Sequence, residues 1–117
     1  MFKKQLKEIP LLENFAVGLF LVANGKFVYL NQAFAQTFGY KKSEIMNREK
    51  FSQVIPPEEQ KIILKNAEQI EKDENASVIY NFNGNKKNGD CVFLECTGVA
   101  FMYEGETYFL SFLLDVT

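Results

Sequence analysis

The stretch that decides the fold is AVGLFLVANGKFVYLNQAFAQTFG, residues 16–39. It holds an apolar run as far as Ala23, the dipeptide Asn24-Gly25 and a second, largely apolar run that ends at Leu30. Because Asn-Gly readily adopts the positive φ angles of a tight turn, this pattern predicts a β-hairpin.

Helices are expected after the hairpin. Asn31 can cap the first of them, through Phe38, because its side chain can accept a hydrogen bond from an unpaired backbone N–H, and Gly39 ends it. Ser43 is expected to cap one further helical turn through Met46. Two more helices are expected over residues 51–55 and from Pro57 to about residue 73, the longer with the apolar stripe Ile62, Ile63, Ala67 and Ile70.

The remainder of the chain predicts three strands, residues 76–85, 91–103 and 107–116, joined by short turns as an antiparallel meander. This order of elements places the hairpin strands beside the late strands, with the helices on one face of the sheet. The expected fold class is therefore α+β, with a five-stranded antiparallel sheet, helices packed on one face and a short N-terminal helix.

One domain is expected from 117 residues, since a second would be too small to bury its own core. Residues 2–9 predict the short amphipathic helix, with Phe2, Leu6 and Ile9 on one side, and Pro10 stops it. We therefore divide the chain into an N-terminal helix, residues 1–12, that covers the sheet or mediates dimerisation, and a domain over residues 13–117.

The charge pattern excludes some classes of partner. The 13 basic and 15 acidic residues leave a net charge of −2, and neither sign gathers into a block, so no nucleic-acid partner is expected. The N-terminus is polar, and no apolar run approaches the roughly 20 residues of a membrane span. We expect a cytoplasmic protein without direct membrane contact.

Cys91 and Cys96 are five positions apart in one predicted strand. This odd spacing places them on opposite faces and about 16 Å apart, too far for a disulfide. The chain has no histidine, so two thiols alone make a poor metal site and no metal is expected.

Several short motifs, in the same order and spacing, resemble those of PAS domains. They are Tyr29-Leu30-Asn31-Gln32-Ala33-Phe34, Gly39-Tyr40 followed by Ser43-Glu44-Ile45, the turn Lys86-Lys87-Asn88-Gly89, and the final Asp115-Val116-Thr117. The sequence departs from the PAS pattern at Asn47, where a glycine is usual, and at Pro56-Pro57-Glu58-Glu59, where His-Pro-Glu-Asp is frequent. Both departures lie beside the usual ligand cleft.

The resemblance implies a sensory PAS domain of a two-component or similar signalling protein. It would bind a small ligand or partner and signal through Asp115, Val116 and Thr117 to a covalently linked effector, a histidine kinase or alternatively a diguanylate cyclase. No enzyme is expected, because the chain has no histidine, no Gly-rich phosphate loop and no Ser or Cys with a base partner at recognisable spacing. A ligand-free structural dimerisation module is the third hypothesis.

Placed on the PAS pattern, alternate residues of the late strands point inward, toward the helices. Gly84 and Gly98 in this inward set leave space for a ligand, and Val92 belongs to the set as well. The set forms either a ligand cavity or simply a hydrophobic core. The candidate ligand-binding residues are Phe34, Phe38, Phe51, Ile63, Ala67, Tyr80, Phe82, Leu94, Cys96, Phe109, Ser111 and Leu113.

Two PAS cofactors are argued against. Haem-binding members usually need an axial histidine, which this chain lacks. Flavin-adduct members carry an Asn-Cys-Arg-Phe stretch, where this sequence has Glu49-Lys50-Phe51-Ser52. We therefore predict no cofactor, and any small ligand is of unknown identity.

The outer face of the sheet is also apolar, so it must be covered. The N-terminal helix and a second copy of the chain are the two candidates, and PAS domains commonly dimerise with that helix between their sheets. Val99 and Tyr108 belong to this face. The candidate residues of a homodimer interface are Phe2, Leu6, Ile9, Phe93, Phe101, Leu110, Phe112 and Leu114.

Overall fold

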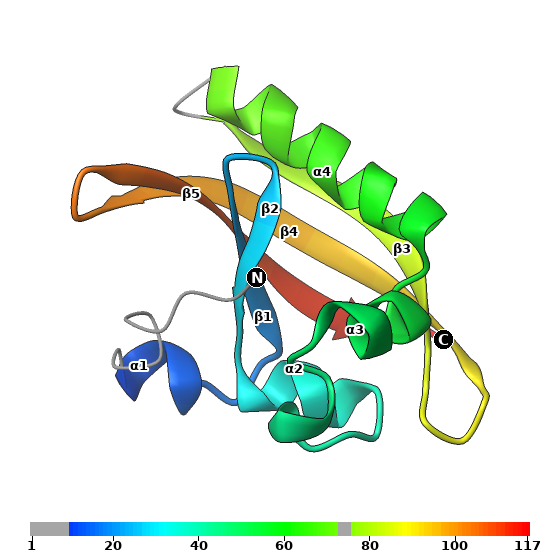
Figure 1. Ribbon diagram of the computed structural model, residues 1–117. Helices are drawn as coiled ribbons and strands as arrows, with labels where there is room; N and C mark the ends of the chain where they lie inside the picture. The colour runs from blue at the N-terminus through cyan, green and yellow to red at the C-terminus, as the bar shows by residue number, and fades with distance from the viewer. Residues whose placement is uncertain (1–9, 73–75) are drawn as a thin grey trace.

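The computed structural model describes residues 10–72 and 76–117, which Figure 1 shows as a single sheet with helices against it. The predicted helix over residues 2–9 lies outside the described residues. The strands are β1 (Leu19–Ala23), β2 (Lys26–Leu30), β3 (Ser77–Asn85), β4 (Cys91–Tyr103) and β5 (Glu106–Asp115). The helices are α1 (Pro10–Glu13), α2 (Gln32–Thr37), the 3-10 turn η2 (Lys42–Glu44), α3 (Arg48–Val54) and α4 (Pro57–Lys72).

The sheet has the strand order β2-β1-β5-β4-β3, and every described pair of strands is antiparallel. The hairpin therefore joins the late strands through β1, which lies beside β5, and this confirms the predicted α+β class and topology. Among the described residues, no helix is long and apolar enough to cross a membrane.

The predicted hairpin is confirmed. Asn24 and Gly25 both have positive φ, 52° and 72°, and join Ala23 directly to Lys26 in the ladder. The first strand begins at Leu19 rather than near residue 16, where the prediction placed it. Gly18 precedes it in close contact with α2, since a Cβ built there would lie 3.1 Å from the Phe34 Cα.

Asn31 is the predicted N-cap of α2 and does more than cap it. Its Oδ1 accepts hydrogen bonds from the Phe34 N–H (2.9 Å) and the Leu19 N–H (3.0 Å). Its Nδ2 donates to the carbonyl oxygens of Leu12 (3.1 Å) and Val17 (3.0 Å). This buried side chain thus joins α2, β1 and the segment that leads into β1.

Two helix starts differ from the prediction. Ser43 is not a cap, because η2 begins at Lys42 and the Glu44 carboxylate accepts the Lys41 N–H at 2.8 Å. The short helix α3 begins earlier than residue 51, because Asn47 caps it by accepting the Lys50 N–H at 2.8 Å. Asn47 therefore has a structural role at the position where a glycine was expected.

The principal helix α4 begins at Pro57 as predicted. Its residues Ile63, Ala67 and Ile70 are buried, but Ile62 is 37% exposed, so its assignment to the buried stripe was wrong. This helix packs mainly on β3, along which it runs in Figure 1, and it also contacts β4 and β5.

Candidate functional site

The predicted ligand-binding residues come together between the inner face of the sheet and the helices. Eleven of the twelve belong to one buried cluster, and Ser111, also buried, lies against it through Tyr80. The burial pattern of the late strands alternates as predicted, and Val92 joins the same cluster. The structure therefore places these side chains together, whereas their binding of a ligand stays a prediction.

The sequence also missed residues of this core. Phe20 and Phe27 meet the helix side chains, with ring centroids 4.9 Å apart for Phe27 and Phe51 and 5.9 Å apart for Phe20 and Phe34. Phe20 and Phe27 alternate with outward residues on β1 and β2, so strand alternation could have found them. Eight aromatic residues lie in this buried cluster; they are Phe20, Phe27, Phe34, Phe38, Phe51, Tyr80, Phe82 and Phe109.

Gly84 and Gly98 do not leave space for a ligand in this structure. A Cβ built at Gly84 would overlap the Phe38 ring, and one at Gly98 would overlap the Phe109 ring. The rings have filled the room that the missing side chains provide, so the prediction of open space at these glycines was wrong. The glycines instead let the sheet and the rings approach closely.

One polar contact lies inside this apolar core. The hydroxyl groups of Tyr80 and Ser111 are 2.6 Å apart and hydrogen-bonded. Burial raises the pKa of Tyr80 well above its usual range, and it raises the pKa of the neighbouring Cys96 thiol to about 12. Both groups are therefore neutral near pH 7. The core can thus offer hydroxyl and thiol groups to a ligand, but no charged group.

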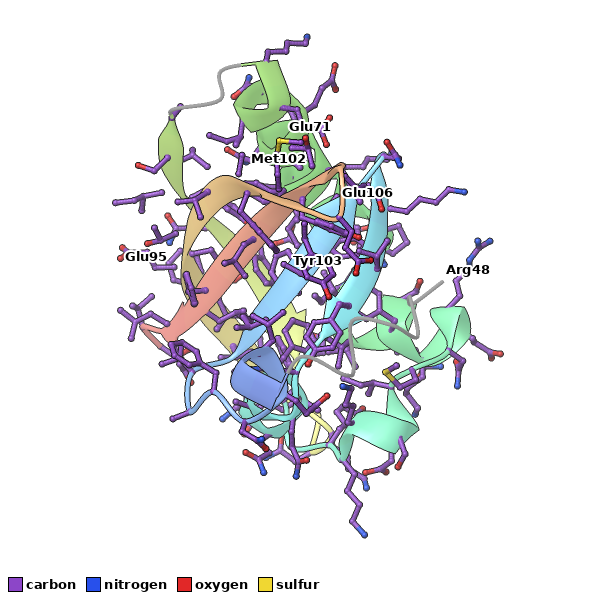
Figure 2. The ribbon with its side chains drawn as sticks, turned by 90° about the vertical axis from the view of Figure 1, so that its left-hand side faces the viewer. Arg48, Glu71, Glu95, Met102, Tyr103 and Glu106 are labelled. Atoms are coloured by element: carbon purple, nitrogen blue, oxygen red, sulfur yellow. The ribbon has the colours of Figure 1, made fainter. Side chains whose placement is uncertain are left out.

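The outer face of the sheet divides into a buried and an exposed part. Leu19, Leu21 and Tyr29, which the sequence analysis missed, form a second buried cluster with Tyr108. Phe101, Leu110 and Phe112 are partly buried against it, together with Leu12 of α1, the helix that lies against this face in Figure 2. In contrast, Phe93 (42%) and Leu114 (58%) are exposed. Of the predicted interface, Phe2, Leu6 and Ile9 lie outside the described residues.

A charged contact fastens the N-terminal side of the domain. The Glu13 carboxylate accepts hydrogen bonds from the Tyr29 hydroxyl (3.0 Å) and the Gln32 N–H (3.2 Å), and it pairs with Lys42. The Lys42 ammonium lies 4.6 Å from the centroid of the Tyr29 ring. Burial raises the pKa of Tyr29, and so do the hydrogen bond to Glu13 and then the Glu13 charge. No spacing in the sequence indicated this contact, because it joins four separate elements, α1, β2, α2 and η2.

The C-terminal residues predicted to carry the signal are held against β4. The Val116 N–H donates to the Phe93 carbonyl (3.0 Å), and the Thr117 hydroxyl accepts the Phe93 N–H (2.8 Å). The Thr117 backbone N–H donates to the Asp115 carboxylate (2.9 Å) and so lowers the pKa of Asp115. The end of the chain is thus fixed to the first residues of β4.

A surface groove of about 510 Å³ lies between the β1–β2 turn and α4. Of the predicted ligand-binding residues, only Ala67 lines it. The groove is therefore separate from the core. Its other lining residues are mostly charged; they are Asn24, Gly25, Lys61, Leu64, Lys65, Glu68 and Glu71.

The family of the chain follows from comparison with known proteins. The model of the PAS fold matches residues 10–116. This chain belongs to the PAS family. PAS domains are generally non-catalytic sensory modules, and this one contains, among its described residues, no cluster of His, Cys, Asp or Glu able to hold a metal ion.

Solved PAS structures share its fold. The PAS domain of an HTR-like protein from Haloarcula marismortui has a TM-score of 0.67 at 21% identity, covering 97% of this chain and 96% of that one. A PAS domain from a two-component sensor histidine kinase has a TM-score of 0.63 at 14% identity, covering 97% and 99%. The LOV protein of Rhodobacter sphaeroides has a TM-score of 0.67 at 15% identity, covering 99% and 69%. No curated protein sequence matches the chain.

Proposed function

We propose that this PAS domain is a sensory module that passes a signal through Asp115-Val116-Thr117 to a covalently linked effector. The supporting observation is the attachment of Val116 and Thr117 to Phe93 on β4. The same strand places Cys96 in the core, beside the Tyr80–Ser111 contact. A change in the core can therefore reach the C-terminal residues along one strand.

A histidine kinase is the effector we favour. The likeness to a PAS domain from a sensor histidine kinase, and to a sensory box histidine kinase/response regulator from Burkholderia thailandensis, supports this choice. A diguanylate cyclase is the alternative effector. We propose a cytoplasmic domain without catalytic activity of its own, without nucleic-acid or direct membrane contact, and acting as a homodimer.

We propose that the signal is a small apolar molecule with one polar group, bound in the core. Its polar group would replace the hydrogen bond between Tyr80 and Ser111, the only hydroxyl pair among the candidate ligand-binding residues. The rings of Phe38 and Phe109 would move from the glycines that they now cover. The same packed glycines favour the competing hypothesis of a filled, ligand-free dimerisation module.

Native mass spectrometry of the purified chain tests ligand binding. A retained small molecule, or a thermal shift with one member of a metabolite panel, supports the sensory role. Ser111→Ala should weaken that response, whereas Thr97→Ala, on the exposed face of β4, should not. A clean apo mass and no shift across the panel would favour the structural module.

The path of the signal is tested in the full-length protein. Thr117→Ala removes the hydroxyl that binds Phe93 and should change the ratio of effector activity with and without the signal. Thr107→Ala is the control, because this residue lies near the opposite end of β5. Equal responses of both variants and the parent would contradict the proposed path.

A further inference from the structure

β3 forms one edge of the sheet, and no strand of the described chain pairs with its outer side. Its register with β4 runs without a bulge from Ser77 to Asn85, and it contains neither a charged residue nor a proline. Natural edge strands are usually protected against pairing by charges, proline or bulges. From Ser77 to Asn81 this edge has none of these protections, and the hydrogen bond that α4 makes to the edge lies beyond this stretch, at Asn83.

The contacts of Asn83 show which backbone groups point outward. Its N–H donates to the Glu59 carboxylate (2.6 Å) and so faces away from β4. In an antiparallel strand the N–H and C=O of one residue point to the same side, and the side alternates along the chain. The backbone groups of Ser77, Ile79 and Asn81 therefore also point outward, and Glu59 at the start of α4 ends this open stretch.

The side chains leave the open stretch uncovered. Asn81 folds back over the sheet, where its Nδ2 donates to the Leu94 carbonyl of β4 (3.2 Å). Ile79 is 68% exposed, and Ser77 is exposed as well. A further strand could thus reach the backbone of this stretch without displacing a side chain from it.

Beyond Glu59, the side of α4 that faces this edge carries no charge. The contact between Glu59 and Asn83 fixes which side of α4 faces the edge. Helical spacing then places Ile62, Asn66 and Gln69 on that same side. In the second half of α4, the charged residues Lys65, Glu68 and Glu71 instead line the groove near the β1–β2 turn.

We propose that this edge pairs with the same edge of a second copy of the chain, about a two-fold axis at Ile79, so that two sheets become one. Antiparallel pairing in this register sets Ile79 opposite its own copy and Ser77 opposite the partner's Asn81. Each of these pairs exchanges both N–H···O bonds, so all the open groups of the stretch are satisfied.

A second copy fits better than an unrelated strand for two reasons. The outward backbone groups of Ser77, Ile79 and Asn81 are evenly spaced about Ile79, so one antiparallel copy in this register can pair with all of them about a two-fold axis. The edge and the α4 stripe of Ile62, Asn66 and Gln69 carry no charge, so the symmetric contact opposes no like charges there. This interface is separate from the outer sheet face and does not depend on the sensory role.

Sedimentation equilibrium of the 117-residue chain tests the proposal. Ile79→Lys should raise the dimer dissociation constant at least about tenfold, because it places like charges directly opposite each other. Thr97→Lys is the matched control. Thr97 is exposed and is the cross-strand neighbour of Ile79, but it lies on an interior strand, so its substitution should leave the constant unchanged.

Asn81→Pro is a second variant aimed at the backbone. It removes an outward N–H, and proline is tolerated on an edge strand where the N–H faces solvent. This variant should weaken the dimer as Ile79→Lys does. Its circular dichroism spectrum should match that of the parent chain, which would show that the fold is retained. A monomeric parent chain would overturn the proposal, and so would equal dissociation of Ile79→Lys and Thr97→Lys, which would place the contact on the outer face.

Discussion

Asn31 shows how one residue can do several tasks that a sequence pattern reveals only in part. Its predicted role was to cap α2, but its side chain also holds Leu19 and two carbonyl groups before β1. A buried group with so many partners leaves unsatisfied donors and acceptors behind when it is removed. The stability lost on removing Asn31 should therefore exceed the stability lost on removing an ordinary N-cap.

We expect Asn31→Ala to lower the free energy of unfolding by about 2 kcal/mol or more, beyond the usual range of a lost N-cap. Asn47→Ala is the control, since Asn47 is exposed and caps α3 with one hydrogen bond; it should cost about 1 kcal/mol. Denaturant midpoints compare the two variants. Equal losses would mean that the bonds to β1 and its leading segment add nothing.

Gly98 provides a second test at the scale of single residues. Adding a methyl group there would press on the Phe109 ring, and overpacking of this kind typically destabilises by about 1–3 kcal/mol. We expect that loss in Gly98→Ala, measured by urea unfolding. Phe109→Leu should recover part of it in the double variant, because the smaller side chain makes room. A neutral Gly98→Ala would show that the ring moves freely, which would favour an adaptable ligand site.

At the scale of elements, the predictable features were those set by neighbours in the chain. The Asn24-Gly25 turn, the alternation of β4 and the start of α4 at Pro57 each depend on local residue types, and the structure confirms them. The Glu13 contact and the glycine-ring packing join distant segments, so no local pattern could reveal them. The ligand site depends on whether rings or a ligand fill the core, which alternation does not decide.

The contact between Tyr80 and Ser111 joins β3 and β5 across β4. Ser111→Ala should destabilise by about 1–3 kcal/mol, because it leaves the buried Tyr80 hydroxyl without this partner. Tyr80→Phe combined with Ser111→Ala should cost less than Ser111→Ala alone, since both polar groups are then removed. A double-mutant cycle on unfolding free energies measures the coupling, and additive losses would contradict it.

At the scale of the whole molecule, the buried thiol predicts how stability depends on pH. The folded chain holds the Cys96 proton to about pH 12, against 9.0 for an ordinary thiol. Stability is therefore fully present below about pH 9 and declines as the pH rises toward 12, because only the unfolded chain releases the proton. Unfolding midpoints should fall less steeply over this range in Cys96→Ala than in Cys91→Ala, whose thiol is exposed. Equally steep falls in the unfolding midpoints of the two variants would show that the Cys96 thiol is not the cause of this pH dependence.

The division of the outer sheet face leads to the last prediction. One part is buried around Leu21 and Tyr29, but Phe93, Leu114 and Val116 remain exposed on the other. Exposed apolar side chains that gather on one face favour association, and a two-fold contact lets the patch meet itself. We expect this patch to form a contact between copies that is separate from the β3 edge, and Leu114→Lys should weaken it, because a charge buried there lacks a partner. Met102→Lys, on the β4–β5 hairpin in Figure 2 and more exposed than Leu114 (68% against 58%), should not weaken it. Sedimentation of both variants decides: a dimer that survives Leu114→Lys but not Ile79→Lys would assign association to the β3 edge alone.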